Sequence, residues 1–164
     1  MKRPVWITLA TLALGVGCAQ PEAGTDAALP VQALYSDSQC VGLERTTVVW
    51  IADAEAWRSW HGRITSARLP APSPPAVDFS REGVLVLTMG SRSTAGYGLS
   101  LAEKSAVVRE GVLTVRVDWS EPPPGALLAQ VMTSPCLLMK VPTAPFDQIR
   151  VVDQQGRMRL EGPR

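Results

Sequence analysis

Every apolar run in this chain is short, because a glycine, a proline or a charged residue soon interrupts it. After the first 17 residues, no run approaches the ~20 apolar residues that a transmembrane helix needs. The chain contains 13 glycines and 14 prolines, a high content for a helical bundle since both residues disfavour helix interiors. Short strands joined by turns are therefore the expected secondary structure.

Strand patterns follow one another along most of the chain. Residues 46–51 and 84–89 are β-branched or apolar almost throughout, and the second run is typical of a buried strand. Residues 112–119 alternate apolar and polar side chains and are predicted to pair with 106–109 in a hairpin. Further strands are expected at 97–101, 126–132 and 136–141, with a closing hairpin of 149–152 and 158–160.

One short helix is expected, and it lies near the start of the domain. Asp53 offers an N-cap oxygen, residues 54–61 are good helix formers, and Gly62 stands where a C-cap glycine belongs. Residues 69–76 carry four prolines and are predicted to form an extended loop. The fold class is therefore mainly β, an antiparallel β-sandwich or barrel-like domain with one short α-helix.

An export signal is predicted over residues 1–17. Lys2 and Arg3 give a positive start, residues 5–16 are apolar apart from two threonines, and small residues follow. This arrangement is typical of a secretory signal peptide.

Residues 14–18 resemble the lipobox of bacterial lipoproteins. The resemblance implies a lipid on the Cys18 thiol, with Ala19 typical of sorting to the outer membrane. The alternative is an ordinary signal peptide that happens to contain a cysteine. Residues 18–33 are rich in Pro, Gly and Ala and predict a flexible tether, which leaves 34–160 as the folded domain.

The charge balance bears on the class of partner. The chain has 16 basic and 15 acidic residues, far from the strongly basic surface of a nucleic-acid binder. The segment 1–17 holds two of the basic residues and no acid, so the mature chain would carry a net charge of −1. No nucleic-acid partner is expected.

Enzyme signatures are largely missing from the sequence. His61 is the one histidine, and a cap or surface position in the last helical turn explains it best. No P-loop, dinucleotide fingerprint or nucleophile elbow occurs. We therefore predict no catalytic residue, no metal site and no cofactor.

The remaining cysteines, Cys40 and Cys136, are expected to form a disulfide. Export would place them in an oxidising compartment, where pairing is the usual outcome. The alternative is two free thiols, with Cys136 acting as a small buried apolar residue.

The loop Arg92-Ser93-Thr94-Ala95-Gly96-Tyr97 joins two predicted strands and is the candidate partner-binding site. Small polar residues on a rigid β scaffold are a common recognition device. The alternative is a structural turn, in which Thr94 bonds the backbone and Tyr97 fills the core.

Four segments together resemble the PrcB-like proteins, named for the lipoprotein subunit of a bacterial surface protease complex. Residues 56–60 resemble the helix with paired tryptophans, and 75–80 the P-x-V-D-F-S step into a buried strand. Residues 90–97 resemble the G-x-R-x-T-G-G-Y loop, with Ala95 in place of its first inner glycine. Residues 133–142 resemble the T-x-P strand near the end of the family pattern.

This resemblance implies a non-catalytic β domain anchored in the cell envelope. Together with the lipobox and Ala19 it predicts a lipid anchor at the outer membrane, with the domain facing the periplasm. Its implied partners are the membrane, through the lipid, and an extracytoplasmic protease or another envelope protein that the domain assembles with or stabilises. An alternative arises because residues 92–98 also resemble the N-P-T-T-G-Y loop of chagasin-type inhibitors of cysteine proteases, which are β-sandwiches.

Overall fold

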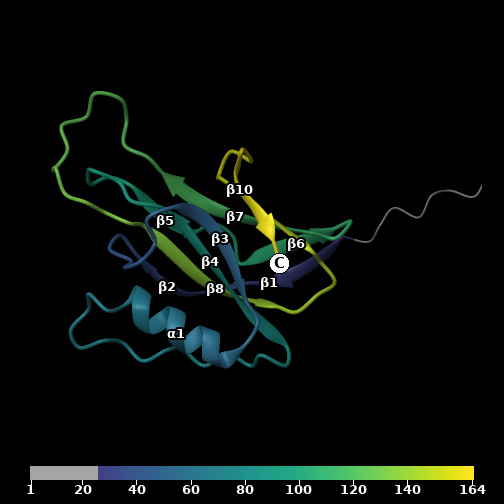
Figure 1. The fold of residues 1–164 in the computed structure, drawn as a ribbon. Helices are drawn as coiled ribbons and strands as arrows, with labels where there is room; N and C mark the ends of the chain where they lie inside the picture. The colour runs from purple at the N-terminus through teal and green to yellow at the C-terminus, as the bar shows by residue number, and fades with distance from the viewer. Residues whose placement is uncertain (1–25) are drawn as a thin grey trace, which may run out of the picture.

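The computed structural model describes residues 26–164, which form two β-sheets and one helix (Figure 1). The predicted signal peptide and the lipidation site Cys18 lie outside these residues. The first sheet has the order β1-β6-β7-β9-β10, with β5 also paired to β7, and the second has the order β2-β8-β4-β3. All ladders are antiparallel except the parallel pair β7–β9. The predicted mainly β class with one short helix is confirmed.

The elements have the following bounds. The first sheet contains β1 (Ala27–Pro30), β5 (Gly98–Leu101), β6 (Ser105–Arg109), β7 (Val112–Ser120), β9 (Gln148–Val152) and β10 (Met158–Pro163). The second contains β2 (Gln32–Asp37), β3 (Thr46–Ile51), β4 (Glu82–Met89) and β8 (Cys136–Pro142), and the helix is α1 (Ala54–Ile64).

Strand β4 is buried on both faces, which explains its uninterrupted apolar sequence. Leu85 and Leu87 belong to the core between the two sheets, together with residues of β7 and β9. Val84 and Val86 belong instead to a second cluster with Trp57 of α1. Figure 1 shows α1 on the outer side of the four-stranded sheet, so that this sheet is covered by helix on one face and by sheet on the other.

The two sheets also approach each other at their edges. Ser36 Oγ in β2 donates a hydrogen bond to the Leu99 carbonyl in β5 at 2.8 Å. At the other edge β10 lies against β3, where a Cβ on Gly162 would be 2.7 Å from Val48 Cγ1. The domain is thus a sandwich whose edges meet in a barrel-like manner.

The helix begins as predicted but ends later. Asp53 Oδ1 accepts hydrogen bonds from the backbone N–H groups of Glu55 and Ala56. Gly62, predicted as the C-cap glycine, lies inside the helix, and Thr65 is the C-cap residue. The His61 carbonyl, one of the end groups of the helix, accepts from both the backbone N–H and the hydroxyl of Thr65, at 3.0 and 2.8 Å.

The predicted tether 18–33 is too long, and the predicted domain 34–160 is too short at both ends. Ala27–Pro30 forms β1 against β6, and β2 already begins at Gln32. Pairing with a distant strand orders this segment despite its weak intrinsic strand propensity. At the other end β10 continues to Pro163.

The strand predicted at 126–132 is also wrong, because this segment is irregular. Three prolines at 122–124 precede it and cannot donate to a ladder. Within residues 26–164 no helix is long and apolar enough to cross a membrane.

Candidate functional site

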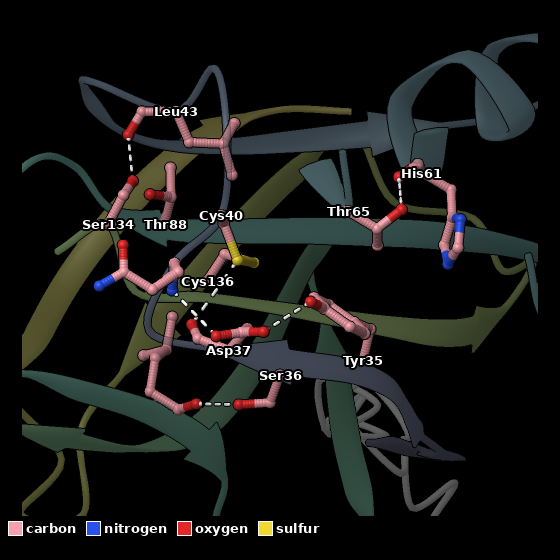
Figure 2. The surroundings of a disulfide bond; sticks show 12 residues. Tyr35, Ser36, Asp37, Cys40, Leu43, His61, Thr65, Thr88, Ser134 and Cys136 are labelled. Carbon is pink, nitrogen blue, oxygen red and sulfur yellow. Dashed lines mark hydrogen bonds between the residues drawn. A yellow bond between two sulfur atoms is a disulfide. The ribbon is translucent and has the colours of Figure 1, made fainter. Parts of the chain in front are cut away.

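The predicted disulfide between Cys40 and Cys136 is present, with the two Cα atoms 6.0 Å apart (Figure 2). It joins the loop after β2 to the first residue of β8, and both cysteines are buried. Ser134 reinforces the link, because its hydroxyl donates to the Leu43 carbonyl at 2.8 Å. Its carbonyl accepts from Cys40 N at 3.1 Å. The loop after β2 is therefore fixed to the chain that enters β8.

The candidate loop 92–97 leaves β4 and is braced by that same entering chain. Arg92 and Thr133 exchange both backbone hydrogen bonds, at 2.7 and 2.8 Å. The Thr133 hydroxyl also donates to the Thr94 carbonyl at 3.1 Å. The predicted loop residues are thus brought together on a scaffold that holds them in one arrangement.

The two largest side chains of this loop, Arg92 and Tyr97, are half-buried. Tyr97 packs against the main core, and the Arg92 guanidinium lies over its ring, 5.1 Å from the centroid. Gly96 has φ +94°, a left-handed conformation that glycine adopts readily, and lies beside Pro122. Only Ser93 and Gly96 of residues 92–97 are exposed. The core packing expected of Tyr97 in a structural turn is therefore present. For Thr94 the expected bond from its side chain to the backbone is replaced by the reverse contact, in which its carbonyl accepts from the Thr133 hydroxyl.

The most exposed apolar residues beside this loop were missed by the sequence prediction. The segment 125–132, which we name the apolar tip, contains Leu127, Val131 and Met132 with relative exposures of 102%, 44% and 62%. It belongs to the long green loop after β7 in Figure 1. The sequence analysis predicted a strand over residues 126–132 and so did not identify the tip as an exposed loop. The absence of charged side chains from residues 122–132 is a signal that the sequence offered.

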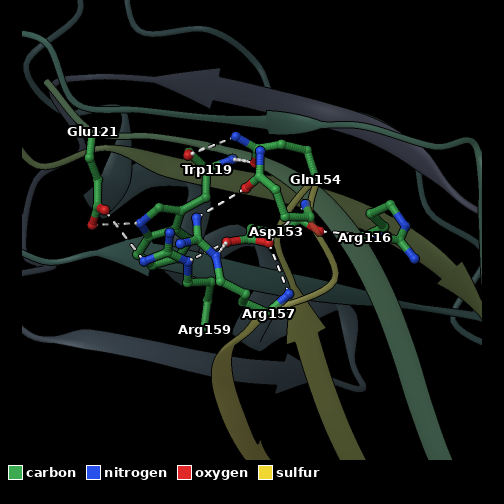
Figure 3. A network of polar contacts seen from close by, with 8 residues as sticks. Arg116, Trp119, Glu121, Asp153, Gln154, Arg157 and Arg159 are labelled. Carbon is green, nitrogen blue, oxygen red and sulfur yellow. Dashed lines mark hydrogen bonds and ion pairs between the residues drawn. The ribbon is translucent and has the colours of Figure 1, made fainter. Parts of the chain in front are cut away.

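A separate polar network lies in the turn between β9 and β10 (Figure 3). The buried Asp153 carboxylate accepts from the backbone N–H groups of Gln155 and Arg157 and from the guanidinium groups of Arg157 and Arg159, all at 2.9 Å. Burial alone would raise the pKa of Asp153, but these hydrogen bonds outweigh it and lower the pKa to about 2. This carboxylate is a fixed anion that holds the turn.

His61 is buried in the last turns of α1, so the cap or surface position predicted for it is wrong. Its ring packs edge-on against Trp57 and Tyr35, and burial lowers its pKa. The part of the chain that the structure describes contains no group of three His, Cys, Asp or Glu side chains that could hold a metal ion.

A groove of about 880 Å³ lies away from the predicted loop. It is found where the chain bends from β1 into β2, and its lining includes Val31, Leu101 and the ion pair Lys140–Glu82 at 3.3 Å. None of the residues 92–97 lines it.

Comparison with known families gives one match. Residues 84–142 match a family model described as PrcB C-terminal, which confirms the resemblance drawn from the sequence over this segment. The matched segment runs from β4 to the end of β8 and includes the loop 92–97, the apolar tip and Cys136. Comparison with curated proteins and with solved structures gave no match.

Proposed function

Because residues 84–142 match the PrcB C-terminal family model, we propose that this chain is a non-catalytic, lipid-anchored protein of the cell envelope. Its β domain binds a protein partner there and assembles with or stabilises an extracytoplasmic protease. The observation that carries the proposal is that the matched segment presents two adjoining loops, 92–97 and the apolar tip, on a base braced by a disulfide. Surface loops positioned by a rigid scaffold are typical recognition elements.

The charged groups with shifted pKa values support a non-catalytic role. Asp26 and Asp78 have lowered pKa values because each accepts side-chain hydrogen bonds, from Arg109 and from Ser80 and Arg81 respectively. Asp153 is held in its turn, and His61 packs between aromatic rings. Structural hydrogen bonds and ion pairs explain the lowered pKa values of the three aspartates, and burial explains that of His61, without a reacting substrate.

The lipid anchor can be tested by labelling cells with a fatty acid that carries an alkyne group. The wild-type chain should take up the label and sediment with membranes, and Cys18→Ser should lose both properties. Equal labelling of the wild type and Cys18→Ser would contradict lipidation at this residue.

The partner can be sought by crosslinking intact envelopes that contain the full-length chain with a tag after Arg164. Recovery of an extracytoplasmic protease, together with a lower level of that protease in cells lacking the chain, is the expected result. Recovery of the uncomplexed chain alone would contradict the proposal.

A protease-inhibitor role is the second candidate, favoured by the similarity of residues 92–98 to the chagasin-type loop. It predicts that micromolar full-length chain in detergent blocks papain-like proteases, and that Gly96→Trp relieves the block. Full protease activity in the presence of the chain would exclude this candidate. The packing of Tyr97 into the core leaves fewer loop side chains for such an inhibitor.

A further inference from the structure

We infer that the apolar tip, residues 125–132, is the surface that contacts the protein partner, and that the partner offers it an uncharged apolar cleft. The inference rests on the proposed function and names its contact surface. Leu127 is completely exposed and Met132 is 62% exposed, whereas apolar side chains of this size are usually buried. Single exposed apolar residues are common, but clustered ones mark interaction sites, and Leu127, Val131 and Met132 fall within six positions of the chain.

The tip is held at its base, which favours binding. Ala95 N donates to the Ala129 carbonyl at 3.1 Å, and Gln39 Nε2 donates to the Met132 carbonyl at 3.2 Å. Thr133, directly after the tip, is the residue paired with Arg92. A loop positioned before binding loses less conformational entropy when its partner arrives.

The charge pattern indicates the chemistry of the partner surface. The eleven residues 122–132 contain no Asp, Glu, Lys, Arg or His. A charged cleft would have to be desolvated against this loop without gaining an ion pair, which is unfavourable. The tip therefore fits an apolar cleft and excludes a strongly acidic or basic one.

The position of the tip argues for a protein and against the lipid bilayer. Figure 1 shows the described chain beginning at one end of the domain and the long loop after β7 at the opposite end. Only the seven residues 19–25 separate Cys18 from Asp26, and even fully extended they span at most about 25 Å. A domain of this length is about 35 Å across, longer than this tether, so a lipid on Cys18 would anchor the end of the domain opposite the tip.

The chain supplies a matched control for a crosslinking test. Leu69 is 94% exposed, close to the value for Leu127, but lies in the loop after α1. A photoreactive amino acid is placed at position 127 or at position 69 of the full-length chain in its own cells. We expect illumination to give a discrete protein adduct from position 127 and none from position 69.

The second step tests whether this adduct reports specific binding. The double variant Leu127→Ser with Met132→Ser should lower co-purification of the same protein by about tenfold or more. Leu69→Ser should leave it unchanged. Both variants should unfold at the wild-type denaturant midpoint, since the substituted side chains are exposed.

Four results would overturn the inference: an adduct with phospholipid, an adduct with a second copy of the chain, equal adducts from both positions, or unchanged co-purification with the double variant. If crosslinking of the wild type still recovers a partner, only the assignment of the surface fails. If the wild type yields no protein partner, the proposed function fails as well.

Discussion

Gly83 in β4 lies directly against the indole ring of Trp50 in β3, so closely that a Cβ at residue 83 would be 2.1 Å from Trp50 Cζ2. The ring in turn packs edge-on against Phe146, with centroids 5.3 Å apart. Glycine is therefore required here by a close approach of side chain to backbone. Gly83→Ala should force the indole out of place and lower the free energy of unfolding by about 1–3 kcal/mol, as measured by urea denaturation.

Gly62→Ala provides the opposite case and the control for that variant. Gly62 lies inside α1, and a Cβ there meets no atom within 4 Å. Alanine should raise the free energy of unfolding by about 0.5–1 kcal/mol, because glycine is unfavourable in a helix interior. Equal stability of the two alanine variants would show that the Trp50 contact does not constrain residue 83.

Removing the disulfide should destabilise the domain. The bridge joins residues 96 positions apart, and cross-links over loops of this size typically contribute about 2–5 kcal/mol. Cys40→Ala with Cys136→Ala should show this loss in urea denaturation. Reductant should then lower the stability of the wild type and leave the double variant unaffected; a wild type indifferent to complete reduction would contradict the prediction.

Acid should weaken the turn that Asp153 holds. The pKa of Asp153 in the folded chain is about 2, below the value of about 3.9 expected in an unfolded chain. The stabilisation is therefore complete above pH ~4 and is lost as the pH falls toward 2. The stability difference between wild type and Asp153→Asn should shrink over this interval, and a difference independent of pH would show that the carboxylate charge contributes nothing.

The brace of the candidate loop can be tested at Thr133. Its hydroxyl donates to the Thr94 carbonyl, and the residue is only 7% exposed. Thr133→Val keeps the shape but leaves that carbonyl without this donor, so it should cost about 1 kcal/mol of unfolding free energy. Thr114→Val, at a half-buried site in β7, should be close to neutral because valine suits a strand.

The elements that could be predicted from the sequence are those whose burial produces a local pattern of apolar and polar residues. β4 is buried on both faces and therefore carries an apolar run, whereas β7 is buried on one face and therefore alternates apolar and polar residues. Both strands were identified from the sequence. β1 was missed, since it is ordered by pairing with β6 and by the ion pair of Asp26 with Arg109, which no local pattern reveals.

At the candidate site the prediction succeeded for covalent and local features. The Cys40–Cys136 pair was predicted from residue type and expected export, and the packing of Tyr97 into the core was part of the structural-turn alternative. The apolar tip was predicted as a strand, because the pattern of a short apolar segment does not distinguish a buried strand from an exposed loop. Its exposure depends on prolines upstream and on hydrogen bonds to the distant loop 92–97.

The strand order also fixes when this domain can fold during synthesis. Among the described strands, β1 pairs with β6, β2 with β8, and β3 with β4, so none of the first three pairs with another of the three. Each of these three strands can pair only after a later strand has been synthesised, and pairing between strands far apart in the sequence is slow. An incomplete chain that stops before Cys136 leaves β2 without a neighbour, Cys40 without its bridge and one edge of β4 without its partner strand β8.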